Sequence, residues 1–434
     1  MTPSDPRGAM TGRGHSSWAV LLALTAAFTL SQAYRTVAAI MAPQLEAEFT
    51  LTPQALGIFA GAFHISFGAL QLLMGVGIDL YGVRRTALVA FPLTIVGAAL
   101  SAWTTHFGVL LFAQVLIGIG CAPAFLVCTV FIARHFPPAR FATLSGVVLG
   151  LGGIGMLVTG TPLAWLMEAH SWRIGFVVLG GASALAWLLI FALVHEPAST
   201  AAVRADESIV GALRSFGALF KMPHTLGILA LAAVTYAAFI TLRGLWIGPL
   251  LIARHDYSLV QSGNVAIAMS LASMISAPLI GRLDPGIRTR RRWIIGFTLA
   301  GIVVFTLMAL NPGVAFDVGS AIVFGLISGY VVLQYADVRG AYPASLTGRA
   351  IALFTMAMFL GVALMQWLTG LVASIATAHA ADAFMAVLGT IALVLAAGAA
   401  AFVWLPRPPR TGDVADPAPD TQTAPAPSRQ STRP

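Results

Sequence analysis

Residues 75–85 read Gly75-Val-Gly-Ile-Asp79-Leu-Tyr-Gly82-Val-Arg84-Arg85. This charged stretch separates two apolar runs, at approximately 54–78 and 86–104, that are each long enough to form a helix. Gly82 permits a tight turn because it lacks a Cβ atom. Asp79 can meet the N-terminus of the following helix or a neighbouring basic side chain. The stretch therefore predicts a short charged loop between two antiparallel helices.

The composition places these helices in a membrane. The chain has 434 residues, of which 58% are hydrophobic and 9% are charged, and its mean hydropathy is +0.87. A soluble domain carries roughly 25% charged residues, and about 20 consecutive apolar residues cross the hydrocarbon core of a bilayer. A scan for such windows predicts twelve membrane-spanning helices, at approximately 18–41, 54–78, 86–104, 107–133, 142–166, 174–194, 225–252, 260–280, 292–310, 315–336, 350–376 and 382–405.

The net charge of +8 follows from topology. Twenty of the 24 Lys and Arg residues fall in the tails or in loops on the same side of the membrane as residues 75–85. Such loops face the cytoplasm, so both termini are expected there. The charge therefore implies no nucleic-acid partner. Short loops, an Ala- and Gly-rich composition and the lack of a sorting motif agree with a multi-pass protein of the bacterial inner membrane.

The chain divides into two halves. We expect six-helix bundles at 17–195 and 225–405, a cytoplasmic linker at 196–224, and cytoplasmic tails at 1–16 and 406–434, the second of which is rich in Pro, Thr, Asp and Arg and should be disordered.

Landmarks recur at a nearly constant offset in the two halves. The separation is 208 residues from Arg35 to Arg243, 205 from Asp79 to Asp284, and 209 from Arg140 to Arg349. Independent landmarks at one spacing indicate a duplicated six-helix unit. The expected fold is therefore an all-α membrane protein of twelve helices in two pseudo-symmetric bundles. Transporters built in this way hold their solute at the interface between the repeats.

The 75–85 stretch resembles the helix 2–3 loop signature of the major facilitator superfamily. The resemblance implies a gating role for Gly75, Asp79, Gly82, Arg84 and Arg85. Gly281-Arg-Leu-Asp284 is similar to a degenerate second copy, which gives Asp284 the same expected role. Leu80 departs from the signature, which usually has a basic residue there. The glycine-rich run from Gly150 to Pro162 resembles the family's helix 5 motif, although Gly160-Thr-Pro162 replaces the usual Gly-Pro pair.

Arg35 and Arg243 are the only Lys or Arg residues in the interior of the expected spans. A charged side chain at mid-bilayer costs about 2.5–3.5 kcal/mol on insertion scales, so such residues usually serve a function. Arg35 precedes Pro43 by eight residues, as in helix 1 of the organic anion symporters and organophosphate antiporters. The antiporters add a second arginine in helix 7, where Arg243 lies. The resemblance implies that the pair binds a carboxylate or phosphate; structural ion pairs or snorkelling are the alternatives.

Other polar residues within the spans are candidate contributors to a binding site. His64 could bind a coupling proton because its ordinary pKa is near neutrality, or it could be a packed hydrogen-bonding residue. No expected span carries Asp or Glu at its middle, so a counter-anion is the other candidate driving partner. The residues expected to orient the substrate, which could equally hold helices together, are Tyr34, Tyr236, Gln334 and Gln366.

The sequence favours a monomeric secondary transporter that moves a small organic anion by alternating access. One alternative is an efflux carrier for amphiphilic drugs or metabolites, which the apolar spans would suit. Another is a membrane sensor that binds ligand without transport. No nucleophile motif, phosphate loop or metal-ligand spacing occurs, so neither an enzyme nor a cofactor or metal site is expected. Cys121 and Cys128, predicted on one helix, are too far apart for a disulfide.

Overall fold

The computed structural model describes residues 17–137, 140–195, 217, 219–310, 312–343 and 346–408, without the side chains of Asp79 and Ala142. The expected tail 1–16, most of the expected linker 196–224 and residues 409–434 lie outside this part of the chain. The helices discussed below are α1 (Ser17–Phe49), α2 (Pro53–Trp103), α3 (Phe107–Cys121), α4 (Ala124–His135), α5 (Phe141–Val158), α6 (Thr161–Ala169), α7 (Trp172–Leu193), α9 (Thr225–Thr241), η3 (Leu242–Trp246), α10 (Ile247–His255), α11 (Leu259–Arg282), α12 (Arg290–Ala309), α13 (Val314–Ser328), α14 (Val331–Ala341), α15 (Thr347–Ala378) and α16 (Ala383–Trp404).

The described residues contain 12 helices long and apolar enough to cross a membrane, as the sequence predicted. The first extends further than expected, to Phe49, and includes Pro43. The second and third spans run together in α2 and are separated by Gly82, whose φ of 83° and ψ of 170° leave the helical region. A left-handed φ favours glycine, which confirms the turn expected at this position.

Four of the spans are interrupted near their middle. They are α3 with α4, α5 with α6, α9 with η3 and α10, and α13 with α14. The break at Ala122–Pro123 corrects the expectation that Cys121 and Cys128 share one helix: Cys121 ends α3 and Cys128 lies in α4, and both are free and buried. The carbonyl oxygen of Ala122 accepts a hydrogen bond from Gln71 Nε2 at 3.2 Å, which compensates for an unmade helical bond.

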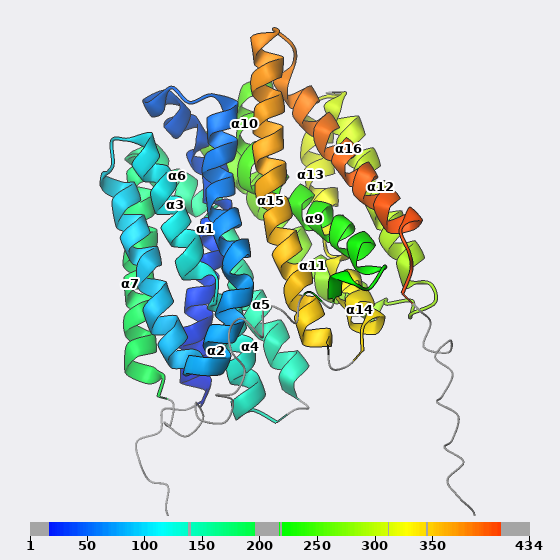
Figure 1. The fold of residues 1–434 in the computed structure, drawn as a ribbon. Helices are drawn as coiled ribbons and strands as arrows, with labels where there is room; N and C mark the ends of the chain where they lie inside the picture. Colours follow the sequence, from blue (N-terminus) through cyan, green and yellow to red (C-terminus); the bar gives the residue numbers. More distant parts are fainter. Residues whose placement is uncertain are drawn as a thin grey trace, which may run out of the picture.

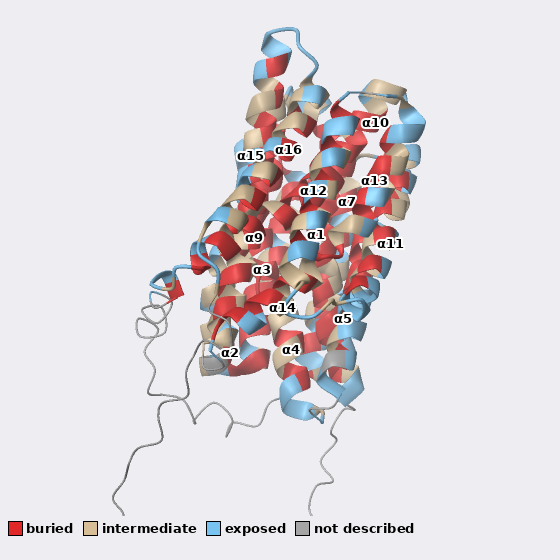
Figure 2. Ribbon diagram, turned by 90° about the vertical axis from the view of Figure 1, so that its right-hand side faces the viewer, coloured by how far each residue is buried: buried red, intermediate tan, exposed pale blue. Residues whose placement is uncertain are grey.

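The helices form two groups, α1–α7 and α9–α16, that lie side by side (Figure 1). The buried residues concentrate where the helices face one another, and exposed ones cover the outer surfaces (Figure 2). We call the end that holds the connections at 79–82, 136–140, 283–289 and 342–346 the basic end; both ends of the described chain lie there, at the bottom of Figure 1. The other end holds the connections at 50–52, 170–171, 256–258 and 379–382, and we call it the outer end.

The two bundles meet tightly toward the outer end. A Cβ atom on Gly370 of α15 would lie 2.7 Å from the Pro53 carbonyl oxygen of α2. One on Gly263 of α11 would lie 2.8 Å from the backbone nitrogen of Thr161. Such distances leave no space for a side chain, so the backbones are in direct contact across the interface.

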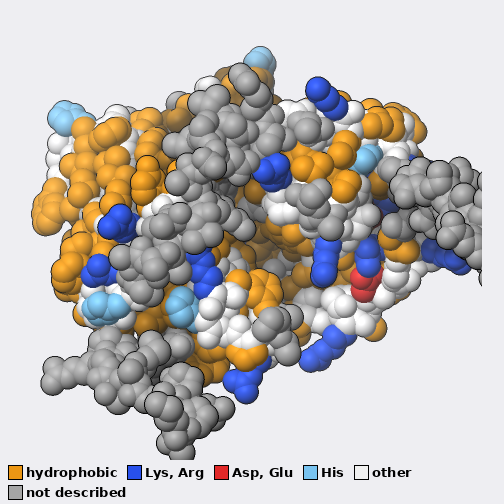
Figure 3. All heavy atoms as spheres, turned by 60° about the horizontal axis from the view of Figure 1, so that its bottom comes forward, with side chains coloured by type: hydrophobic (Ala, Val, Ile, Leu, Met, Phe, Trp, Pro, Cys, Tyr) orange, Lys and Arg blue, Asp and Glu red, His pale blue; other side chains and the backbone are white. Residues whose placement is uncertain are grey.

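The bundles separate toward the basic end. Cβ atoms on Gly146 and Gly150, in the first half of α5, would meet no heavy atom of the described residues within 4 Å. Figure 3 shows a hollow between the bundles at this end, with hydrophobic walls and basic side chains around it. The described chain is thus closed at the outer end and open at the basic end.

Candidate functional site

Arg35 lies on α1 in the middle of the molecule and is 7% exposed. Its guanidinium carbon lies 4.6 Å from the ring centroid of Phe67 on α2 and 4.6 Å from that of Phe359 on α15. Cation–π attraction to two rings holds the group between the bundles. Nη2 contacts Ser31 Oγ at 3.5 Å, and Nε has no hydrogen-bond partner in the described structure. Arg35 therefore keeps unused donor capacity.

Arg243 is completely buried and lies in η3, a five-residue π-helical segment between α9 and α10. Single π-helical turns within α-helices are frequent at functional sites because they redirect side chains. Nε donates to Ser270 Oγ of α11 at 2.8 Å, and Nη2 donates across the interface to the Met156 carbonyl oxygen of α5 at 2.6 Å. Nη1 has no hydrogen-bond partner among the described residues.

The structure brings the two arginine-bearing segments together. A Cβ atom on Gly244 would lie 3.1 Å from the carbonyl oxygen of Arg35, so η3 and α1 touch beside both arginines. Thr159 Oγ1 lies 2.7 Å from Thr36 Oγ1 and 3.5 Å from Arg243 Nη2. A continuous polar contact therefore runs from the residue after Arg35 to Arg243.

Neither arginine has a carboxylate partner within the described part of the chain. All ion pairs found there involve other residues, none of them in contact with Arg35 or Arg243. A buried unpaired cation is costly, and an anionic ligand would supply the missing partner. This arrangement argues against the alternative of two structural ion pairs.

Two further sequence-predicted residues contribute unsatisfied polar atoms. His64 is buried in α2, with Nδ1 at 3.1 Å from the Ala60 carbonyl oxygen and Nε2 without a partner. Its ring stacks on Phe359, which also contacts Arg35. Gln366 on α15 is fully buried beside the His64 side chain, and neither its amide nitrogen nor its oxygen makes a hydrogen bond of good geometry among the described residues. Buried polar groups are normally satisfied, so these atoms are candidates for ligand contacts.

The remaining predicted binding residues have protein partners. The Tyr34 hydroxyl lies 3.3 Å from Ser183 Oγ of α7, within the first bundle. Gln334 Oε1 accepts from Thr235 Oγ1 at 3.1 Å within the second bundle, although Gln334 Nε2 is unsatisfied. Tyr236 packs edge-on against Phe359, with 5.5 Å between ring centroids. We call the rings of Phe67 and Phe359 the aromatic cage of Arg35. Of these three residues, Tyr236 is the one in contact with this cage.

Sequence reasoning missed Phe67, Phe359, Ser270, Thr159 and the carbonyl oxygen of Met156. The two phenylalanines have no sequence signal, since the chain contains 25 phenylalanines. Ser270 and Thr159 look like ordinary small residues of packed membrane helices. The carbonyl oxygen of Met156 lies in the last turn of α5, which ends at Val158, and accepts from the Thr159 hydroxyl at 3.1 Å as well as from Arg243.

The predicted gating residues lie at the basic end. Arg84 Nη2 donates to the Phe191 carbonyl oxygen of α7 at 3.3 Å, and Arg85 is exposed. Gly75 lies within the helical part of α2, and Gly82 forms the turn. The side chain of Asp79 is outside the description.

Asp284, in the second copy of the motif, pairs with Arg290 at 2.6 Å and also caps Gly286 N. Arg290 in turn donates to the Ala336 carbonyl oxygen of α14 at 3.2 Å. Hydrogen bonds from Arg290 hold the pKa of Asp284 below its ordinary value. The pair therefore joins the loop after α11 to the middle of α14.

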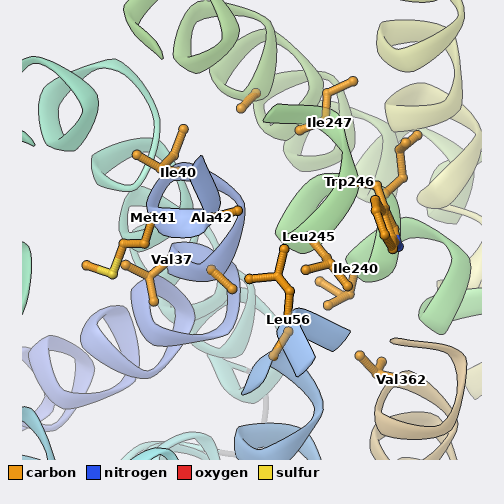
Figure 4. Close-up of a cluster of buried hydrophobic side chains, with 14 of the residues drawn as sticks. Val37, Ile40, Met41, Ala42, Leu56, Ile240, Leu245, Trp246, Ile247 and Val362 are labelled. Carbon is orange, nitrogen blue, oxygen red and sulfur yellow. The ribbon is translucent and has the colours of Figure 1, made fainter. Parts of the chain in front are cut away.

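An apolar layer covers the site on its outer side. Val37, Ile40 and Met41 follow Arg35 along α1, and Leu245, Trp246 and Ile247 follow Arg243. Figure 4 shows Leu245, Ile240 and Leu56 close together between the bundles, whereas Val37 and Met41 point away from them and Trp246 points toward α15. The layer excludes water from the outer end, which strengthens charge interactions at the arginines below it.

Comparison with known proteins agrees with this architecture. The family model described as Major Facilitator Superfamily matches residues 23–338. The chain therefore belongs to the major facilitator superfamily of transporters. Among solved structures, the nucleoside transporter NupG gives a TM-score of 0.70 at 16% identity, covering 89% of this chain and 98% of that one. A bacterial homologue of the human lysosomal transporter Spinster, in an inward-facing and occupied conformation, gives 0.69 at 16% identity, covering 88% and 95%.

Curated relatives match a shorter part of the chain. The hexuronate transporter of Bacillus subtilis (strain 168) is 27% identical over 160 residues, which cover 37% of this chain and 38% of the relative. The probable sulfoacetate transporter of Cupriavidus necator is 28% identical over 153 residues, 35% of each. The D-galactonate transporter of Escherichia coli O6:H1 is 26% identical over 159 residues, 37% of each. Each match thus spans little more than a third of the relative's length.

Proposed function

We propose that the protein is a secondary carrier for a small organic anion, held between Arg35 and Arg243. The observation that supports this most strongly is the pair of buried guanidinium groups that have no carboxylate partner among the described residues. The three named relatives are transporters of carboxylates or a sulfonate. Among the anions, we favour a sugar acid, because the unsatisfied atoms of His64 and Gln366 could bind hydroxyl groups beside a carboxylate that the arginines bind.

The bond from Arg243 to Met156 suggests how binding would be linked to movement. It joins the second bundle to the first, and the donor is the same Nη2 group that an anion would attract. An arriving anion would compete with the Met156 carbonyl oxygen because charged acceptors make the stronger hydrogen bonds. Binding would thus loosen one contact that holds the bundles in their present arrangement. Alternating access would follow from rocking of the two bundles, with the 75–85 loop latching one state.

The experiment is a thermal-shift screen of the purified protein against carboxylated, phosphorylated, sulfonated, neutral and cationic compounds. A ligand at about 100 times its dissociation constant adds about 2.7 kcal/mol of apparent stability. We expect one anion class to stabilise the wild type. The shift should be lost in Arg243→Ala, since each hydrogen bond to a charged group contributes about 1.5–3 kcal/mol. Arg288→Ala, which removes an exposed arginine without an assigned role, is the matched control and should keep the full shift.

Stabilisation by neutral or cationic amphiphiles alone would contradict this proposal and favour the efflux alternative. Ligand binding without flux in reconstituted vesicles would favour the sensor alternative. Both results are accessible with the same protein preparation.

A further inference from the structure

The outer end of the second bundle contains a buried group of charged residues that the arginine site does not use. His255 Nε2 lies 2.8 Å from Asp317 Oδ2, and Arg254 Nη2 lies 2.8 Å from Asp382 Oδ2. Arg254 Nη1 is 3.9 Å from Asp317 Oδ2. We call these four residues the outer cluster. They come from α10, from α13 and from the connection before α16.

Asp317 is fully buried, and its carboxylate is incompletely satisfied. Oδ2 accepts a hydrogen bond from His255, whereas Oδ1 is buried without any hydrogen-bond partner in the described structure. Asp317 lies in the first turn of α13, near the start of the span expected at 315–336. An isolated buried carboxylate is unfavourable, so it is either paired or protonated.

The main ion-pair partner of Arg254 is Asp382. It donates to Asp382 at 2.8 Å and to the Met308 carbonyl oxygen of α12 at 3.3 Å, while its contact with Asp317 is longer than a hydrogen bond. Asp382 also accepts from the backbone nitrogens of Phe384 and Met385 at the start of α16. Asp317 therefore depends on His255 as its hydrogen-bond donor.

The formal charges of the outer cluster do not balance when His255 is neutral. Two carboxylates face one guanidinium, which leaves one negative charge in excess. One added proton, on His255 or on Asp317, makes the cluster neutral. Asp256, the next residue in the chain, adopts the left-handed conformation that ends α10.

The first bundle has a corresponding cluster that is balanced. Glu48 at the end of α1 makes a bidentate ion pair with Arg173 of α7, at 2.7 and 2.5 Å, and accepts from Trp172 Nε1 at 2.7 Å. One carboxylate meets one guanidinium there, so no proton is required. The Glu48–Arg173 pair is therefore a structural clamp, whereas the outer cluster lacks one positive charge.

The outer cluster is positioned to influence the site. α10 follows η3 directly, and 12 residues of helix, about 18 Å, separate His255 from Arg243. The same helix closes the outer end, because a Cβ atom on Gly248 would lie 2.6 Å from the Ala39 carbonyl oxygen of α1. Protons can reach the cluster from its edge, since the Asp382 side chain is 41% exposed.

We propose that His255 and Asp317 together bind the proton that drives transport, and that α10 connects this site to Arg243. This inference rests on the proposed anion carrier and adds its driving ion. A proton carried with a monovalent anion makes the transport cycle electroneutral. His64 is less suited to the role, because no carboxylate of the described residues contacts it and its ring packs against Phe63 and Phe359.

The test compares wild type, Asp317→Asn, His255→Gln and the control Glu48→Gln in proteoliposomes with labelled D-galactonate as the probe. We expect the first two variants to lose accumulation driven by an inward proton gradient while they retain exchange at equal pH. Glu48→Gln should retain both activities. Gradient-driven accumulation by Asp317→Asn at the wild-type level would overturn the proposal. So would accumulation that follows a sodium gradient rather than a pH gradient.

A second measurement keeps the test independent of the substrate. If wild type neither binds nor exchanges the probe, the proposed substrate class fails, and the outer cluster is tested by thermal unfolding between about pH 8 and about pH 5.5. Protonation balances the wild-type cluster, whereas Asp317→Asn has no excess charge to balance. The stability advantage of wild type over Asp317→Asn should therefore grow as the pH falls. If the difference in stability between wild type and Asp317→Asn stays constant across this range, the proton site is overturned. It is also overturned if the difference between wild type and Glu48→Gln grows in the same way as the pH falls.

Discussion

Phe359 is in contact with several residues of the candidate site. Its ring lies against Arg35, His64, Phe67 and Tyr236. A phenyl ring can hold a guanidinium group without neutralising it, so the charge remains available to a ligand. This arrangement explains how Arg35 is buried although no described residue gives it an acidic partner.

We expect Phe359→Leu to weaken anion binding without abolishing it. A buried cation–π contact contributes about 0.5–2 kcal/mol, and the second ring, Phe67, still holds Arg35. Titration of the best anion from the screen against wild type and variant would measure the loss. Phe297→Leu is the control, because that ring packs on Tyr330 rather than on Arg35. Unchanged affinity in Phe359→Leu would contradict the role given to the aromatic cage.

The Asp284–Arg290 pair at the basic end predicts a pH-dependent stability. The pKa of Asp284 is lower in the folded chain than in the unfolded one, so the pair stabilises the fold above the unfolded pKa, about 3.9, and this contribution is lost as the pH falls through the folded pKa. Asp284→Asn should therefore unfold at a lower temperature than wild type at neutral pH. The difference should shrink below about pH 4. Unfolding curves at both pH values check this, and a difference that widens in acid would contradict it.

Arg35 and Arg243 could be predicted from sequence because a charge stands out within an apolar run. The contacts that place them could not, since they are made by phenylalanines, hydroxyls and a backbone carbonyl that occur throughout the chain. The His255–Asp317 pair was missed for a different reason. Its members lie near helix ends, where charges are usually solvated, and 62 residues separate them.

At the scale of helices, close backbone contact closes the outer end. Gly370 of α15 faces α2 of the other bundle, whereas Gly361 of the same helix faces Ala233 within its own bundle. Both positions lack space for a Cβ atom. The contact at Gly370 joins the two bundles and must open during transport. The contact at Gly361 lies within one bundle and must persist.

We expect Gly370→Ala to open the outer end. The added methyl group would meet the Pro53 carbonyl oxygen, and overpacking of this kind costs typically about 1–3 kcal/mol. The readout is labelling of Ser374→Cys, a residue whose hydroxyl accepts from Gln54 N across the closed interface, by a membrane-impermeant maleimide. Labelling should accelerate in Gly370→Ala. Gly389→Ala, which meets open space, should leave the rate unchanged. Equal rates in the two variants would contradict the assigned closure.

The helix breaks mark the limit of prediction from hydropathy. All expected spans are found, but an 18- to 20-residue apolar window does not distinguish a continuous helix from one interrupted at Ala122 or Thr159. The sequence likewise gives no signal for the π-helical segment at Arg243. Its residues, Leu242–Trp246, fit an α-helix as well as a π-helix, and tertiary contacts with α1 and α11 decide between them.

At the scale of the whole molecule, the sequence predicted the two-bundle architecture but not its state. Landmark spacing and the charged loop were sufficient for the family. Which end is closed depends on contacts between the bundles, and these change during a transport cycle while the helices themselves persist. In the present arrangement the hollow between the bundles faces the basic end, while the site residues themselves are buried.

The expected linker and tails remain predictions, as do the bilayer orientation and the monomeric state. The bundle boundaries, 17–195 and 225–405, likewise remain predictions. A single chain contains both arginines and the aromatic cage, so the proposed site requires no second copy.

Counterflow is the most direct test of the anion site between the arginines. Proteoliposomes preloaded with the stabilising anion would receive the labelled anion at equal pH, with wild type, Arg35→Gln, Arg243→Ala and the control Arg288→Ala, an exposed arginine without an assigned role. Wild type and Arg288→Ala should exchange label, and the other two variants should not, although they reconstitute and unfold cooperatively. Exchange at the wild-type rate in both Arg35→Gln and Arg243→Ala would show that the anion is not held between these residues.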